Sequence, residues 1–141
     1  MTQTQPLARM VEYEEADARV RAVYDDILAT KGIKAVPNFW KTLGSHPPLL
    51  EDVWANIKRT MTPGRLDALT KEMIAIAVSA AHGCDYCLNS HTAAARKLGL
   101  DDTMLGELLD VVGAFSRTNK LADAYQVPVD EPLARIARGE S

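Results

Sequence analysis

Apolar residues recur at helical spacing along almost the whole chain, and this periodicity limits the fold more than any other feature. Between residues 20 and 28 they follow the i, i+3, i+4, i+7, i+8 spacing of an amphipathic helix. Similar stripes run through residues 49–61 and 104–121, and strand-like alternation never lasts more than a few residues. The 141 residues are enough for one domain. The pattern therefore predicts an all-α fold, a single domain of residues 1–141 with about six helices.

Proline, glycine and capping residues predict where the central helices begin and end. Thr62–Pro63 is a favourable helix start, so we expect a helix from about residue 65 to residue 81. That segment is apolar almost all round in its second half, which indicates burial on most sides. His82–Gly83 should interrupt it, and a new helix over residues 84–98 should end at Gly99.

The last long helix contains two glycines. Asp101 should cap this helix, which carries an apolar stripe as far as residue 121. Gly106 and Gly113 each cost roughly 1 kcal/mol relative to alanine inside a helix. Close packing of another helix, within the subunit or across an interface, would offset that cost. Pro128 and Pro132 then mark a tail with room for one final turn.

Charge and composition exclude several classes of function. The net charge is −3 with acids and bases interspersed, so nothing would recruit nucleic acid or an anionic membrane. The longest apolar run, Met73–Ala81, is about half the length of a membrane-spanning helix. The polar N-terminal residues have no apolar core, so we expect no signal peptide. We therefore expect a cytoplasmic protein that binds neither nucleic acid nor membrane.

Both cysteines of the chain lie in one short segment that also holds a histidine. Cys84, Cys87 and His91 are spaced three and four residues apart. Because each residue of a helix turns by about 100°, the three side chains share one narrow face. The loop between the cysteines is too short to staple a secreted fold. In a cytoplasmic protein, a lone CxxC pair indicates redox chemistry or metal binding.

The redox interpretation uses all three side chains. Cys84 lies at the start of the expected helix, where the helix dipole and unpaired N–H groups favour a thiolate. Cys87 lies one turn further on, four residues from His91, whose imidazole can take a thiol proton. Attack of a thiolate on a peroxide gives a sulfenic acid, and a second thiol resolves it to a disulfide. The pair therefore suits a dithiol peroxidase or a disulfide reductase.

Two other interpretations of the cysteines remain open. They could be small buried hydrophobic residues that share a helix by chance. A metal site would need four ligands, and Cys84, Cys87 and His91 could be completed by Glu72 or His82. A structural zinc site usually has a second Cys/His pair about 12–20 residues further on, and this chain has none.

Glu72 is an unusual residue because it begins the nearly all-apolar part of its helix. Its face carries small residues, among them Ser79, so another helix can approach closely and partly bury the carboxylate. A buried carboxylate needs a partner. His91 would be oriented and made more basic by such a pairing, which completes a relay from Glu72 through His91 to Cys87. The alternative is an exposed glutamate paired with Arg65 or Lys71.

Other side chains are candidates for accessory roles. His82 could cap the preceding helix or flank the site, and Tyr86, between the cysteines, could donate a hydrogen bond or simply pack. Ser79 is a further accessory candidate because it shares the face of Glu72. Three aromatic residues are expected in the core, or as walls of a substrate cavity: Phe39, Trp40 and Trp54.

The spacing of these residues resembles a known family signature. Glu72, eleven residues, Cys84-Asp85-Tyr86-Cys87, three residues and His91 match the carboxymuconolactone decarboxylase/alkylhydroperoxidase D-like superfamily. The similarity extends over about residues 60–100. It implies an all-helical fold that assembles as trimers or hexamers, and peroxidase activity.

The resemblance also implies a role for each site residue. Cys87 would be the peroxidatic thiol, Cys84 the resolving thiol, and Glu72 with His91 the proton relay. The implied reductant is external, dihydrolipoamide on a lipoylated partner or a thioredoxin-like donor, and no bound cofactor or metal is expected. Decarboxylase members lack the CxxC pair, so its presence argues against lactone decarboxylation.

One departure from the family pattern concerns the residue before the second cysteine. Alkylhydroperoxidase D proteins proper are longer and carry a histidine where this chain has Tyr86. The chain therefore resembles a shorter, peroxidase-related member. Our first hypothesis is a cysteine-based peroxidase that reduces hydrogen peroxide or organic hydroperoxides. The alternatives are a thiol–disulfide redox sensor or binding protein with little turnover and, third, a metal-binding module.

Overall fold

The computed structural model describes residues 5–140, and over that range the regular structure is entirely helical. This confirms the predicted all-α class. Seven α-helices and one 3₁₀ turn follow one another in this part of the chain, against about six helices expected. The chain divides into two compact units, Met1–Thr62 and Pro63–Ser141, which are described one at a time.

The first unit is built around a small aromatic core. Tyr24, Ile27 and Leu50 are fully buried, and burial of the aliphatic pair, Ile27 and Leu50, stabilises the fold by about 1.5–3 kcal/mol each. Trp40 and Trp54 pack edge to face beside them, with ring centroids 5.3 Å apart. The helical elements of this unit are a 3₁₀ turn (Tyr13–Glu15), α1 (Ala18–Lys31), α2 (Asn38–Leu43) and α3 (Pro47–Met61).

The expectation that all three aromatic residues of this region are core is wrong for Phe39. Its side chain stays 41% exposed, whereas both tryptophans are buried. Phe39 is the second residue of α2 and contacts the edge of Trp40, with centroids 5.0 Å apart. Phe39 therefore lies at the border of this core rather than inside it.

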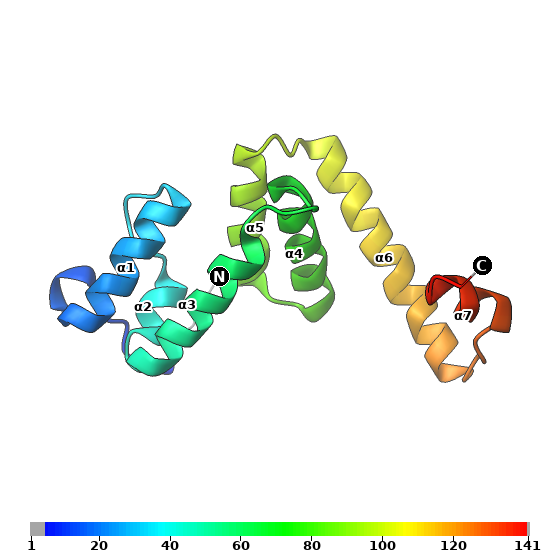
Figure 1. Ribbon diagram of the computed structural model, residues 1–141, viewed down its shortest axis with the longest axis horizontal. Coiled ribbons are helices and arrows are strands. Elements are labelled where there is room, and N and C mark those ends of the chain that lie inside the picture. The colour runs from blue at the N-terminus through cyan, green and yellow to red at the C-terminus, as the bar shows by residue number, and fades with distance from the viewer. Residues whose placement is uncertain (1–4, 141) are drawn as a thin grey trace. The chain divides into compact units, whose positions relative to one another are not determined.

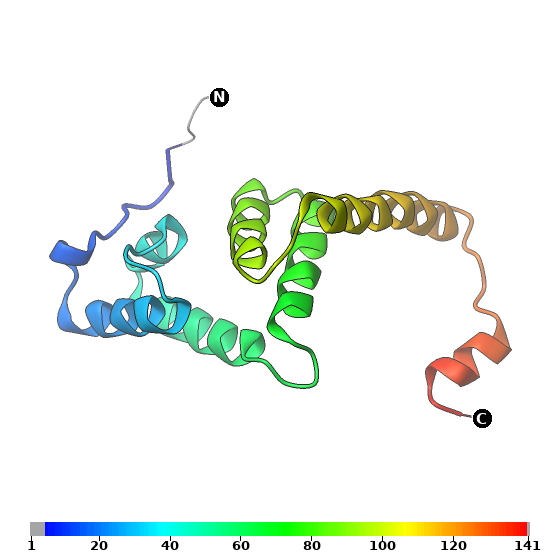
Figure 2. The same cartoon turned by 90° about the horizontal axis from the view of Figure 1, so that it is seen from above.

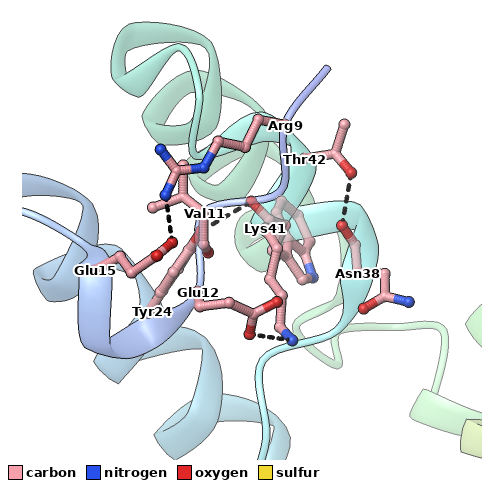
Figure 3. Close-up of polar contacts among 9 residues, drawn as sticks. Arg9, Val11, Glu12, Glu15, Tyr24, Asn38, Lys41 and Thr42 are labelled. Carbon is pink, nitrogen blue, oxygen red and sulfur yellow. Dashed lines mark hydrogen bonds and ion pairs between the residues drawn. The ribbon is translucent and has the colours of Figure 1, made fainter. Parts of the chain in front are cut away.

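The segment before α1 is held against α2 by polar contacts (Figure 3). The Val11 N–H donates to the Lys41 carbonyl at 2.9 Å, and the Lys41 ammonium pairs with Glu12 at 2.7 Å. The buried Tyr24 hydroxyl donates to the Val11 carbonyl at 3.0 Å. Gly44 lies against this hydroxyl, and a Cβ at that position would overlap the hydroxyl oxygen. The glycine is therefore needed for its lack of a side chain.

In the second unit two helices form an antiparallel pair. α4 and α5 lie side by side in both views, and α6 leaves this pair and runs on beyond it (Figures 1 and 2). Ile76, Ala95 and Leu100 form the buried centre, flanked by apolar side chains of α4, α5 and α6. The helices of this unit are α4 (Ala68–His82), α5 (Asp85–Lys97), α6 (Asp102–Ala124) and α7 (Glu131–Ala137).

The start of α4 differs from the prediction. Thr62 was expected to cap this helix, but its hydroxyl donates to the Lys58 carbonyl and closes α3 instead. Asp67 is the true N-cap, because its carboxylate accepts the Thr70 N–H at 2.7 Å. α4 therefore begins at Ala68, about one turn later than predicted.

α6 has no buried residue along its length. Large apolar side chains on it remain 39–58% exposed: Leu109, Val111, Phe115 and Leu121. A Cβ at Gly106 or Gly113 would meet open space, so the expected close packing against these glycines does not occur within the described chain. Within residues 5–140, no helix is long and apolar enough to cross a membrane.

Candidate active site

A tight turn joins α4 to α5 and places the first cysteine. Gly83 ends α4 in the left-handed conformation, with φ of 72°, which a residue with a Cβ adopts only at a cost of roughly 1–2 kcal/mol. The Cys84 N–H donates to the Ser79 carbonyl at 3.0 Å. The chain thus reverses over two residues, and Cys84 arrives at the N-terminus of α5.

The two cysteines form a disulfide at the beginning of α5. Cys84 is the N-cap of the helix rather than its first residue, and its sulfur accepts the Cys87 N–H at 3.2 Å. Sequence reasoning missed this capping role, although Gly83 before Cys84 was a signal for a helix boundary at this point. Both side chains are half-buried. The sulfur of Cys84 therefore also caps the helix that carries the pair.

The carboxylate of Glu72 binds the imidazole of His91. Glu72 Oε2 lies 2.7 Å from His91 Nδ1, and their side chains are 14% and 29% exposed. Glu72 comes from the second turn of α4 and His91 from the second turn of α5, so the packing of the two helices makes the pair. Of the two pairings predicted for Glu72, the structure shows the one with His91.

The pairing fixes which ring nitrogen of His91 is free. An ionised carboxylate only accepts hydrogen bonds, so the Nδ1 that faces Glu72 carries the proton and donates it. Nε2 is then the basic nitrogen of the neutral ring. A histidine held in this way can accept a proton at Nε2 while Glu72 stabilises the resulting cation.

Helix geometry places the disulfide beside this pair. Cys87 and His91 are four residues apart on α5, a spacing that brings their Cβ atoms to about 5–6 Å. The predicted shared face therefore exists, with Cys84 at its N-terminal end. Four chemically active groups, two sulfurs, an imidazole and a carboxylate, come from the adjoining turns of two packed helices.

The accessory candidates contribute less to this arrangement. The hydroxyl of the buried Ser79 donates to the Ala75 carbonyl of its own helix at 2.6 Å, so Ser79 acts through its backbone carbonyl. His82 is the exposed last residue of α4. The ring of Tyr86, between the cysteines, is 44% exposed.

The structure does not assemble the metal site that the sequence left open. That site would need Cys84, Cys87 and His91 with Glu72 or His82. Across residues 5–140, no three histidine, cysteine or acidic side chains are arranged to hold a metal ion. The two sulfurs are instead bonded to each other.

Known proteins are similar to this chain in sequence and in fold. A sequence model of the carboxymuconolactone decarboxylase family matches residues 47–130, more than half of the chain. The chain belongs to this family. Within the carboxymuconolactone decarboxylase family it is similar to the alkyl hydroperoxide reductase AhpD of Rhodococcus erythropolis, with 26% identity over 135 residues. That alignment covers 89% of this chain and 75% of the relative.

A solved structure in the comparisons agrees with this assignment. The crystal structure of the alkylhydroperoxidase AhpD core from Rhodospirillum rubrum is 42% identical and superposes with a TM-score of 0.88. The match covers 93% of this chain and 98% of that one. The resemblance noted in the sequence is thereby confirmed over nearly the whole chain.

Proposed function

We propose that this protein is a cysteine-based peroxidase that reduces hydrogen peroxide or organic hydroperoxides through a dithiol/disulfide cycle. The observation that carries the proposal is the Glu72–His91 pair beside the Cys84–Cys87 disulfide. A redox pair alone would serve many functions. A redox pair with its own positioned base suits a reaction in which a thiol must lose a proton and an oxygen must gain one.

The first step begins from the reduced protein. His91 takes the proton of the Cys87 thiol, and the thiolate attacks the terminal oxygen of the hydroperoxide. The new bond is S–O, the bond that breaks is O–O, and the alkoxide leaves with the proton that His91 returns. The products are an alcohol and a sulfenic acid on Cys87. The carboxylate of Glu72 stabilises the charged imidazole while it holds the proton.

The second step forms the disulfide seen in the structure. The Cys84 thiol attacks the Cys87 sulfenic acid, the S–O bond breaks, and the departing hydroxide combines with the Cys84 proton to give water. An external dithiol, such as dihydrolipoamide or the thiols of a thioredoxin-like protein, then reduces the disulfide and is itself oxidised. The position of Cys84 at the N-terminus of α5 stabilises the thiolate that this reduction releases.

Substitution of single cysteines tests the proposal. Peroxide consumption is measured with cumene hydroperoxide and dihydrolipoamide, and the fold is checked by circular dichroism. Cys87→Ser should abolish consumption, whereas Cys84→Ser should still form a sulfenic acid once but not turn over. A folded Cys87→Ser protein with full activity would refute the assignment.

A redox sensor with little turnover would use the same residues. Stopped-flow mixing of the reduced protein with peroxide separates the two functions. A peroxidase is oxidised rapidly and cycles when dihydrolipoamide is added. A sensor is oxidised once and slowly, and the dithiol does not restore repeated consumption.

We also propose that the active protein is a homo-oligomer, a trimer or hexamer. The support is the exposed apolar surface of α6 around Val111 and Phe115, because an isolated soluble chain rarely leaves such a helix uncovered. Light scattering coupled to gel filtration should give three or six times the 15.4 kDa mass of the chain. Phe115→Asp should reduce that mass. A monomeric wild-type protein would refute the proposal.

A further inference from the structure

A polar hollow lies between the end of α4 and the second half of α6. It has a volume of about 370 Å³ and is lined by Ala81, Ser116, Asn119, Lys120 and Asp123. Every lining residue from α6 is polar. None of these residues belongs to the relay or to the disulfide, so the hollow is separate from the groups that carry the chemistry.

The hollow exists because one face of α6 changes character along its length. Leu105 and Leu108 on this face pack against the core of the unit. Ser116 and Asn119 follow them after eleven residues, about three turns, and so lie on nearly the same face. This face of α6 is therefore apolar where it packs beside the middle of α4, and it becomes polar where α6 passes the end of α4. Ser116, Asn119 and Lys120 carry donors that suit the unpaired carbonyls at the end of α4, and the hollow beside them leaves room for a ligand.

The hollow is close to the redox pair. Ala81 belongs to the last turn of α4 and precedes Cys84 by three residues. Consecutive Cα atoms are 3.8 Å apart, so the Cα atoms of these two residues are separated by no more than about 11 Å. The edge of the hollow at Ala81 is therefore within the length of a medium-chain molecule from the first cysteine.

The lining offers hydrogen-bond donors for an anion. Lys120 supplies the positive charge, and within residues 5–140 its ammonium has no ion pair. Ser116 and Asn119 add a hydroxyl and an amide, both neutral donors. Asp123 is the one acidic side chain of the lining, and it would oppose an anion rather than bind it.

We propose that this hollow binds the carboxylate of a molecule whose other end reacts at Cys84–Cys87. The inference rests on the proposed peroxidase function and specifies its substrate class. Two kinds of molecule carry such a carboxylate: an acidic organic hydroperoxide, and an acidic dithiol that reduces the disulfide. Lys120 binds the carboxylate in either case, and the reactive group extends toward the sulfurs.

Matched acid and neutral compounds test the proposal. The first pair is linoleic acid hydroperoxide and its methyl ester, and the second is dihydrolipoic acid and dihydrolipoamide. Lys120→Met should lower kcat/KM about tenfold for the acid of at least one pair, with the neutral compound unchanged. Lys97→Met, the same substitution on the exposed end of α5, is the control and should change neither. The pair that responds identifies the source of the carboxylate.

A binding measurement separates this inference from the proposed function. Calorimetric titration with hydroxylinoleic acid, the reduced product, needs no turnover. Binding that is lost in Lys120→Met and strengthened in Asp123→Asn supports the hollow even if the protein proves inactive as a peroxidase. Equal kinetics of acid and neutral compounds in wild type and Lys120→Met, with no Lys120-dependent binding, would overturn it.

Discussion

The proposed relay between Glu72 and His91 makes a graded prediction about the rate of thiol oxidation. Glu72→Gln preserves the size of the side chain and an oxygen that can accept the Nδ1–H, but it removes the charge. Glu72→Leu removes the acceptor as well. The two variants therefore separate the contribution of the charge from that of the hydrogen bond.

The magnitude follows from the geometry of the pair. Nδ1 and Oε2 are 2.7 Å apart with both side chains mostly shielded, so the bond is a charge-assisted one. Such bonds contribute about 1.5–3 kcal/mol, against about 0.5–1.5 kcal/mol for neutral ones. The difference, about 1–1.5 kcal/mol, corresponds to a factor of roughly 5 to 13. Glu72→Gln should slow oxidation about tenfold, and Glu72→Leu roughly 10- to 150-fold.

The assay is the rate at which reduced protein loses its two thiols to peroxide, followed by rapid quenching and thiol titration. Glu107→Gln, on the exposed surface of α6, is the matched control and should react as the wild type does. His91→Gln should be at least as slow as Glu72→Leu. The double variant Glu72→Leu/His91→Gln should be no slower than His91→Gln, because residues that act as one unit are not additive.

Two results would contradict this reasoning. If Glu72→Leu were oxidised at the wild-type rate, the carboxylate would have no part in the chemistry. If the two substitutions multiplied in the double variant, Glu72 and His91 would act separately, and the 2.7 Å contact would be structural only.

Two further predictions concern the unit that holds both tryptophans. Gly44→Ala should lower the free energy of unfolding by about 1–3 kcal/mol, because the new Cβ overlaps the Tyr24 hydroxyl. The loss should be smaller in a Tyr24→Phe background, which lacks that hydroxyl. Urea unfolding followed by tryptophan fluorescence measures both. Hydrogen bonds from Lys58 and then from Trp54 hold the pKa of Asp26 below its usual value. The stability that this adds is present above the ordinary aspartate pKa of about 3.9 and disappears as the pH falls through the lower pKa of the folded state. Acid titration of unfolding should therefore show a steeper loss below about pH 4 in the wild type than in Asp26→Asn, and parallel curves would count against the ion pair.

The site was largely predictable because it is made of short-range helical geometry. The spacing of Cys84, Cys87 and His91 determines that their side chains share a face once the segment is helical. The small residues around Glu72 indicated close approach of another helix, which α5 provides. The choice of His91 as the partner of Glu72 required the structure, since the sequence left a surface pairing equally open.

The features that the sequence did not predict depend on which groups become neighbours in the folded chain. Asp67 caps α4 in place of Thr62 because a carboxylate accepts the orphan N–H while Thr62 closes the preceding helix. The open space around Gly106 and Gly113 could not be foreseen, because helical spacing does not say whether a face has a partner. The polar stretch of α6 also gave no signal until its position beside the end of α4 was known.

The α4–α5 hairpin also bears on how the protein is made. Glu72 and His91 are nineteen residues apart in sequence, and the disulfide lies between them. Contacts over so short a separation form quickly, because little chain entropy is lost in closing the loop. Glu72, both cysteines and His91 therefore lie within one hairpin, and the contacts between them are local ones. A chain that forms this hairpin early in folding therefore brings the two cysteines and the Glu72–His91 pair together in one step.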